Sequence, residues 1–356
     1  MPGSLAGMPA HRMNREEFYT KLAALDDEGV RKALWTLYWR GSAHVRERIE
    51  AQLDPEPVVA RRRGAPEPPD AGAVLAEARE FVALARKGAY LAGDRRVSPR
   101  ERSRWRFTFK RMVADAQDAL RGDDVDTAGA ALELLVDLAC ETRGYEYFRS
   151  EDPMQAAGVV VSDAVARLWT AVREEHGFAE LARRAAPQLI RWESPYGWTR
   201  YGSGKVAEKE RSLAAVLVGM LTAPDHWDAM AACYLDALDA VAEQRAAPRS
   251  GWSVDYARKE RARALAEWHE LLVERLVGAE AEALLDRLVG HRALHGAELM
   301  FVEARLAYLR GDEGRARQLV HDCLEELPGH RGFLDFAERV AAPLPPRARE
   351  LAARPR

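Results

Sequence analysis

The chain has 356 residues, of which 47% are hydrophobic and 31% are charged, and its formal net charge is −3 at pH 7. This composition is typical of a folded globular protein and excludes an intrinsically disordered chain. The small negative charge excludes a general attraction to nucleic acids or anionic membranes, so such binding would need a local basic patch.

The cysteines and the hydropathy pattern favour an intracellular protein. Cys140, Cys233 and Cys323 lie far apart within apolar helical runs, which argues against a disulfide framework and against a zinc cluster. We expect them to be buried structural thiols in a reducing compartment. Residues 1–13 lack an apolar stretch of signal-peptide length, and no later segment approaches twenty apolar residues without a charge. We therefore expect a cytoplasmic protein with no membrane contact.

The first predicted unit is a small group of three helices at residues 14–53. Asn14 and Glu17 have the spacing of a capping box, and apolar residues follow at helical intervals. Trp35 and Trp39 lie in the second helical run, where large rings usually anchor packing between helices. We expect both rings to be buried against neighbouring helices.

The rest of the chain divides by composition. We expect residues 1–13 to be a disordered tail and the proline-rich residues 54–72 to be an extended linker, since proline interrupts helices. A helical array follows at 73–341. The last residues, 342–356, combine prolines with arginines, and we expect a second disordered tail there.

Amphipathic helical periodicity dominates the array, and no strand pattern of any length is present. The clearest helix start is Ser98-Pro99-Arg100-Glu101, with serine at the N-cap, proline at the first helical position and glutamate at the third. Asp152-Pro153 and Pro224-Asp225 mark two more starts. The predicted fold is therefore all-α: antiparallel helical hairpins that form an irregular α-solenoid-like array, with a small N-terminal helical unit.

Residues 297–328 resemble one tetratricopeptide repeat. On the 34-residue pattern of that family, Ala304 and Ala316 fall at the two small positions and Gly311 at the turn. Val320 falls at a large apolar position, and Pro328 is the closing proline. Small residues let two helices approach closely, glycine permits the tight turn, and proline ends the second helix. The resemblance implies a concave surface that binds a peptide or a partner protein.

The same pattern also departs from the family. Glu303 and Ala307 stand where the family prefers a large apolar residue and an aromatic residue. The turn sequence Leu309-Arg310-Gly311-Asp312 has an upstream counterpart in Leu120-Arg121-Gly122-Asp123, but there the following small residue, Ala128, comes one position late. The resemblance thus covers one repeat well and a second one loosely.

The candidate binding segment is 191–205, which interrupts two helical runs with four aromatic residues, three cations and three glycines. Such a loop could clamp a partner, because rings offer flat faces and arginine offers a planar set of donors. The candidate residues are Trp192, Tyr196, Trp198, Arg200, Tyr201 and Lys205. We expect the two tryptophans to be exposed. In the other interpretation, which is the commoner one, the rings only fill the groove beneath a long connection.

Two functions of other classes remain open. The basic stretch 100–111 places Arg100, Arg104, Phe107 and Arg111 on one helical face. Together with the aromatic loop 191–205, this stretch suits a nucleic-acid-associated protein. An enzyme with a pocket between helices is the other alternative, with the carboxylates of Glu151, Asp152 and Asp163 as candidate acid–base groups.

The sequence offers no catalytic or metal-binding motif. His291 and His295 have the spacing of two ligands on one helix face, but position 292 is arginine where the metalloprotease motif has glutamate. We expect no metal and no cofactor. The preferred hypothesis is a cytoplasmic interaction or scaffold protein that binds a partner protein or peptide along a groove of the array.

Overall fold

The computed structural model describes residues 15–40, 46, 49, 67–244, 254–279 and 281–353. Contacts divide the chain into two compact units, Met1–Glu67 and Pro68–Arg356. The boundary between them falls inside the proline-rich segment 54–72. The expected tail at 1–13 and most of that segment lie outside the described residues.

The N-terminal unit contains helices α1 (Arg15–Ala23) and α2 (Asp27–Arg40). The expected packing role of Trp35 and Trp39 is wrong: their side chains are 60% and 71% exposed, and the two rings stack on each other with centroids 5.8 Å apart. α2 contains no buried residue, so its apolar side chains are not packed into a core formed by the described residues. Asn14 and most of the expected third helix lie outside the described residues.

The second unit is built from helices, which confirms the all-α fold class. Its described residues form no strand, and the only β-type pairing among them is an isolated bridge between Tyr90 and Phe148. The first helices of this unit are α5 (Ala71–Arg86), α6 (Pro99–Ala119), α7 (Val125–Glu141), α8 (Pro153–Ala157), α9 (Val161–His176), α10 (Phe178–Trp192), the 3-10 helix η1 (Ala207–Lys209), α11 (Leu213–Val218) and α12 (Pro224–Glu243). The remaining ones are α13 (Val254–Ala264), α14 (Ala266–Gly278), α15 (Glu282–Val289), α16 (Ala297–Leu309), α17 (Glu313–Glu326), α18 (Arg331–Arg339) and α19 (Pro346–Ala352).

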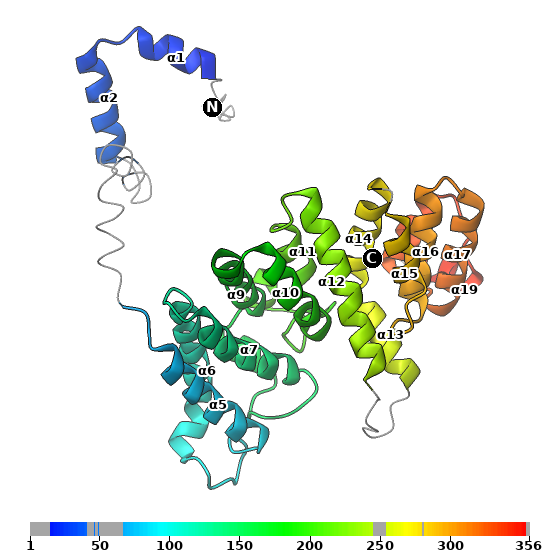
Figure 1. The fold of residues 1–356 in the computed structure, drawn as a ribbon, viewed down its shortest axis with the longest axis horizontal. Helices are drawn as coiled ribbons and strands as arrows, with labels where there is room; N and C mark the ends of the chain where they lie inside the picture. The colour runs from blue at the N-terminus through cyan, green and yellow to red at the C-terminus, as the bar shows by residue number, and fades with distance from the viewer. Residues whose placement is uncertain are drawn as a thin grey trace, which may run out of the picture. The chain divides into compact units, whose positions relative to one another are not determined.

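The helices of this unit pack mainly against near neighbours in chain order. The principal pairs join α5 to α7, α10 to α12, α14 to α16 and α16 to α17, and Figure 1 shows the colours advancing steadily from α5 to α19. Such local packing is the arrangement of a helical array, in which each helix packs mainly against helices one or two places away in chain order.

The predicted helix starts are correct where the local chemistry is strong. α6 begins with the complete capping box: the hydroxyl of Ser98 accepts from the backbone N–H of Glu101, and the Glu101 carboxylate accepts from the backbone N–H of Ser98. α8 and α12 begin at the predicted prolines. α5 begins at Ala71, two residues before the expected start, because the carboxylate of Asp70 caps its first turn.

Two hydrophobic clusters share α16. Leu299, Val302 and Leu306 belong to the large cluster that begins in α5, and Phe301 and Ala304 belong to a second cluster with α17, α18 and α19. α16 therefore joins the last helices to the rest of the array. The second cluster also corrects the expected disordered tail at 342–356, because residues 346–352 form α19 and its Ala348 is fully buried.

The hairpin of α16 and α17 buries small and apolar residues and turns at a glycine. Ala304, Ala316 and Val320 are fully buried, and Gly311 adopts a φ of 80° in the turn, a conformation that other residues rarely adopt. Asp312 then caps α17 directly after Gly311. In the upstream turn the cap of α7 is Asp124, one position further from its glycine, which explains the late Ala128.

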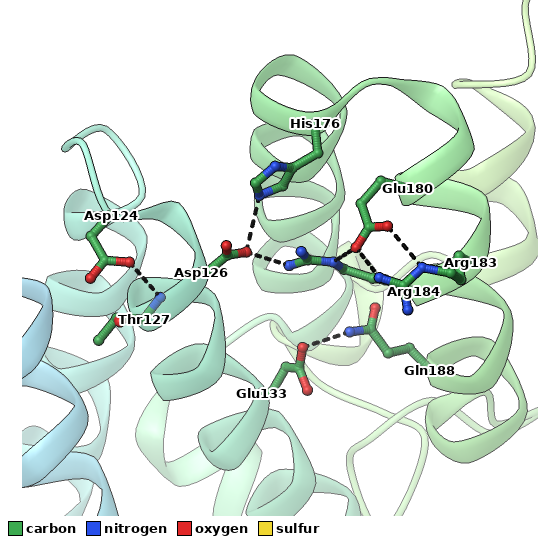
Figure 2. Close-up of polar contacts among 9 residues, drawn as sticks. All are labelled: Asp124, Asp126, Thr127, Glu133, His176, Glu180, Arg183, Arg184 and Gln188. Carbon is green, nitrogen blue, oxygen red and sulfur yellow. Dashed lines mark hydrogen bonds and ion pairs between the residues drawn. The ribbon is translucent and has the colours of Figure 1, made fainter.

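Polar contacts join α10 and the end of α9 to α7, as Figure 2 shows. The carboxylate of Asp126 on α7 accepts from the Arg184 guanidinium at 2.6 Å and lies 3.0 Å from the His176 imidazole. Deeper in the interface, the Gln188 amide donates to Glu133 at 2.8 Å and accepts from the buried Trp169 indole at 2.6 Å. These bonds set the position at which α10 ends and the candidate binding segment begins.

Candidate functional site

The tryptophans of the candidate segment are structural. Trp192 and Trp198 are buried, so the expectation that they are exposed is wrong. The Trp198 indole donates to the backbone carbonyl of Trp192 at 3.2 Å, and the Trp192 indole donates to Asp137 of α7 at 2.6 Å. Because each indole N–H has a partner, both rings can be buried without leaving an unsatisfied donor.

Arg200 also belongs to the framework. Its backbone N–H donates to the Asp152 carboxylate at 2.9 Å, and its guanidinium donates to the carbonyl of Thr142 at 3.4 Å. Asp152 itself caps α8 by accepting from the backbone N–H of Gln155. Arg200 therefore connects the segment to the end of α7 and the start of α8. Its donors are used within the fold and not for a ligand.

A buried carboxylate, Glu193, closes the start of the segment. Its two oxygens accept from the backbone N–H groups of Ser194 at 2.9 Å and Ala214 at 2.8 Å, which fixes the end of α10 to the first turn of α11. Burial raises the pKa of Glu193 to about 7 despite these backbone hydrogen bonds. Sequence reasoning missed Glu193, because a single glutamate at a helix end carries no distinguishing pattern.

Glu210, which follows the segment in the chain, also holds a helix start through its carboxylate. Its carboxylate accepts from the backbone N–H groups of Val161 at 2.8 Å and Ser162 at 2.9 Å, and from the Ser162 hydroxyl at 2.6 Å. It thereby caps α9 from a distant part of the chain, where a carboxylate is favoured by the unpaired N–H groups of the helix start. Burial also raises the pKa of Glu210.

This fixed segment forms one wall of a cleft of about 1020 Å³. The opposite walls come from the junction of α13 and α14, with Glu298 of α16, and from the turn between α17 and α18. The lining residues are Glu193, Ser194, Pro195, Tyr196, Gly197, Trp198, Thr199, Gly202, Ala207, Glu210, Arg211, Ser212, Arg263, Ala264, Ala266, Glu267, Glu270, Glu298, Leu327, Pro328, Gly329, His330, Arg331 and Gly332.

The cleft separates the six sequence-predicted residues into two groups. Tyr196 and Trp198 line it, whereas Trp192, Arg200, Tyr201 and Lys205 do not. The two tyrosines are almost equally exposed, at 69% for Tyr196 and 67% for Tyr201. They therefore differ in whether they line the cleft and not in their exposure to solvent. Sequence reasoning also missed the two opposite walls, which come from residues 263–270, Glu298 and residues 327–332.

Polar side chains that are held by hydrogen bonds or ion pairs border the cleft. Glu298 is buried and holds the guanidinium of Arg263 at 2.9 Å, and Glu267 accepts from the hydroxyl of Ser212, the N-cap residue of α11, at 2.7 Å. The hydroxyl oxygen of Thr199 is buried, with no hydrogen-bond partner. The walls are therefore pre-organised by their own contacts, which lowers the entropy cost of binding.

The carboxylates expected for an enzyme do not meet in this cleft. None of Glu151, Asp152 and Asp163 lines it. Asp152 is used as a helix cap, and Asp163 forms an exposed ion pair with Arg211 at 3.6 Å. Helix capping explains these acids, since Asp and Glu are favoured at helix starts in any protein.

The histidines and cysteines hold separate positions. His291 lies 3.0 Å from Asp239, and His295 lies 3.6 Å from Asp255, so each imidazole has its own carboxylate. Cys323 is buried, whereas Cys140 and Cys233 are only half-buried, and all three are free thiols. In the described ranges no group of three or more His, Cys, Asp and Glu side chains could hold a metal ion.

Comparison with models of protein families, with curated proteins and with solved structures gives no match. The resemblance of residues 297–328 to a tetratricopeptide repeat therefore stays a prediction. Within the described part of the chain, no helix has both the length and the apolar character needed to cross a membrane.

Proposed function

We propose that this protein is an interaction or scaffold protein that binds a peptide segment of a partner protein in the cleft beside residues 193–212. The observation that carries the proposal is the cleft itself. Its volume of about 1020 Å³ lies at the upper limit of small-ligand pockets, which span roughly 300–1,000 Å³. Three walls from separate parts of the chain around such a space suit an extended segment of a few residues.

The wall chemistry supports a peptide. Tyr196 offers an exposed ring with a polar end, Leu327 and Pro328 offer apolar surface, and Arg263 and Glu267 offer charged hydrogen-bonding groups. Interfaces that bind peptides combine such aromatic anchors with polar groups at their rim. The resemblance of α16 and α17 to a tetratricopeptide repeat implies the same role, and we place the protein in the cytoplasm for this function.

A selection from a random peptide library on the full-length chain tests the proposal. The affinity of the best peptide is then measured for the native chain and for two single variants, Tyr196→Ala and Tyr201→Ala. We expect Tyr196→Ala to raise the Kd about tenfold, as loss of an aromatic anchor worth about 1.4 kcal/mol does. Tyr201→Ala is the matched control, with the same residue type and a similar exposed fraction outside the cleft, and its Kd should change less than about twofold.

Two results would contradict the proposal. One is a selection that enriches no peptide against the folded chain. The other is an enriched peptide whose Kd is raised equally by both tyrosine variants, because the binding site would then not be the cleft.

A further inference from the structure

A second surface, on α6, carries positive charges that form no ion pairs among the described residues. The outward side of α6 bears Arg100, Arg104, Arg106 and Lys110, all of them exposed. None of these four side chains forms an ion pair among the described residues, whereas Arg111 of the same helix forms two. We call these four residues, together with Phe107, the α6 basic face.

Helix geometry places Arg100, Arg104 and Phe107 in one row along the outward side of α6. Arg100, Arg104 and Phe107 repeat at helical intervals, and Arg106 and Lys110 lie along the adjacent edge. The face extends over about 15 Å from its first to its last cation, at a rise of about 1.5 Å per residue. Trp105, Phe109 and Met112 occupy the opposite side of α6 and are buried, so the cations cannot turn inward.

The neighbouring acids are already engaged. Arg111 continues the same row, but Glu77 of α5 and Asp115 pair with it. Glu101, which lies at the first turn, accepts from the backbone N–H of Ser98 in the capping box. The carboxylates nearest to the face are therefore held by other partners, and the four cations keep their charge facing solvent.

An aromatic ring stands in the middle of these cations. Phe107 is 57% exposed, and the guanidinium of Arg106 lies 4.8 Å from its ring centroid. A shallow hollow of about 320 Å³ runs beside the ring, lined by Arg100, Arg104, Phe107 and Arg111 among others. An exposed ring among unpaired cations offers stacking to a base and charge to the phosphates next to it.

We infer that the α6 basic face binds single-stranded nucleic acid. Stacking on Phe107 requires an unpaired base, which a duplex does not present, and the arginine row follows a flexible phosphate backbone. The net charge of the whole chain is −3, so the attraction is local and acts over about one Debye length, roughly 10 Å at 0.1 M salt. This surface is independent of the cleft and does not rest on the proposed peptide binding.

The test measures fluorescence anisotropy of labelled twelve-nucleotide dT and U strands with the full-length chain at several salt concentrations. We expect saturable binding at low salt whose affinity falls steeply as salt rises. The triple variant Arg100→Gln, Arg104→Gln, Arg106→Gln should bind at least tenfold more weakly and show a shallower salt dependence. Phe107→Ala should weaken binding about tenfold and leave the salt dependence unchanged.

A second triple variant provides the matched control. Arg167→Gln, Arg339→Gln, Arg347→Gln removes three exposed arginines on other helices that likewise form no ion pair within the described residues, so the net charge changes by the same amount. It should bind like the native chain. Equal weakening in both triple variants, equal affinity for a duplex of the same sequence, or no binding at low salt would each overturn the inference.

Discussion

Residues 193–212 and the α6 basic face both combine aromatic rings with cations, yet they use them in opposite ways. In the first, Trp198 is buried and Arg200 donates to a backbone carbonyl. On α6, Phe107 is exposed and Arg104 has no ion pair among the described residues. An aromatic and cationic composition therefore does not by itself identify a binding surface. Such side chains are available to a ligand only where they are not buried or bonded within the fold.

The largest expected effect concerns the buried rings. Trp198→Ala should lower the free energy of unfolding by about 3–5 kcal/mol, because it leaves a cavity and removes the bond to the Trp192 carbonyl. Phe107→Ala, the exposed counterpart on α6, should change it by less than about 0.5 kcal/mol. Chemical denaturation of both variants measures the contrast, and similar losses would show that the two regions are built alike.

The next effect is pH-dependent and concerns Glu193. Its pKa in the fold is about 7, above the ordinary value of 4.5, so between these pH values the folded state binds more protons than the unfolded state. Ionisation of Glu193 therefore reduces the free energy of unfolding as pH rises through this window, by roughly 3 kcal/mol at most. Glu193→Gln should remove that slope. Denaturation of both proteins from pH 4.5 to 8 checks it, and parallel curves would refute the role of this carboxylate.

A smaller contrast separates two arginines. Arg200→Ala should cost about 1 kcal/mol, since it removes donors from the Thr142 carbonyl at the end of α7. Arg104→Ala should be nearly neutral, within about 0.5 kcal/mol, because its side chain stabilises no other group. Thermal unfolding measures the stability of both variants. An Arg104 variant as unstable as the Arg200 variant would contradict the view that the α6 basic face does not stabilise the fold.

The sequence predicts helices better than it predicts the site, for a physical reason. In α6, regular spacing tells which residues share a side, so the basic row could be identified before the structure was known. Residues 193–212 have no such period, and nothing in the sequence distinguishes Tyr196, which lines the cleft, from Tyr201, which does not.

The wrong predictions also concern features that depend on contacts between distant parts of the chain. Whether Trp35 is covered depends on which helices pack on α2, and whether residues 346–352 are ordered depends on a cluster formed with α16 and α18. Glu193 accepts from a backbone N–H group 21 residues away in the sequence, and Glu210 accepts from one 49 residues away. Long-range contacts of this kind leave no local pattern, whereas capping boxes such as that of Ser98 act within one helical turn.

The most direct test of the central claim, that the cleft binds a peptide, is amide hydrogen exchange of the full-length chain with and without the best selected peptide. We expect amide hydrogen exchange to slow on all three walls together, at residues 193–202, 263–270 and 327–332, while the exchange rates of α6 stay unchanged. Protection confined to any other surface, or to one wall alone, would contradict it.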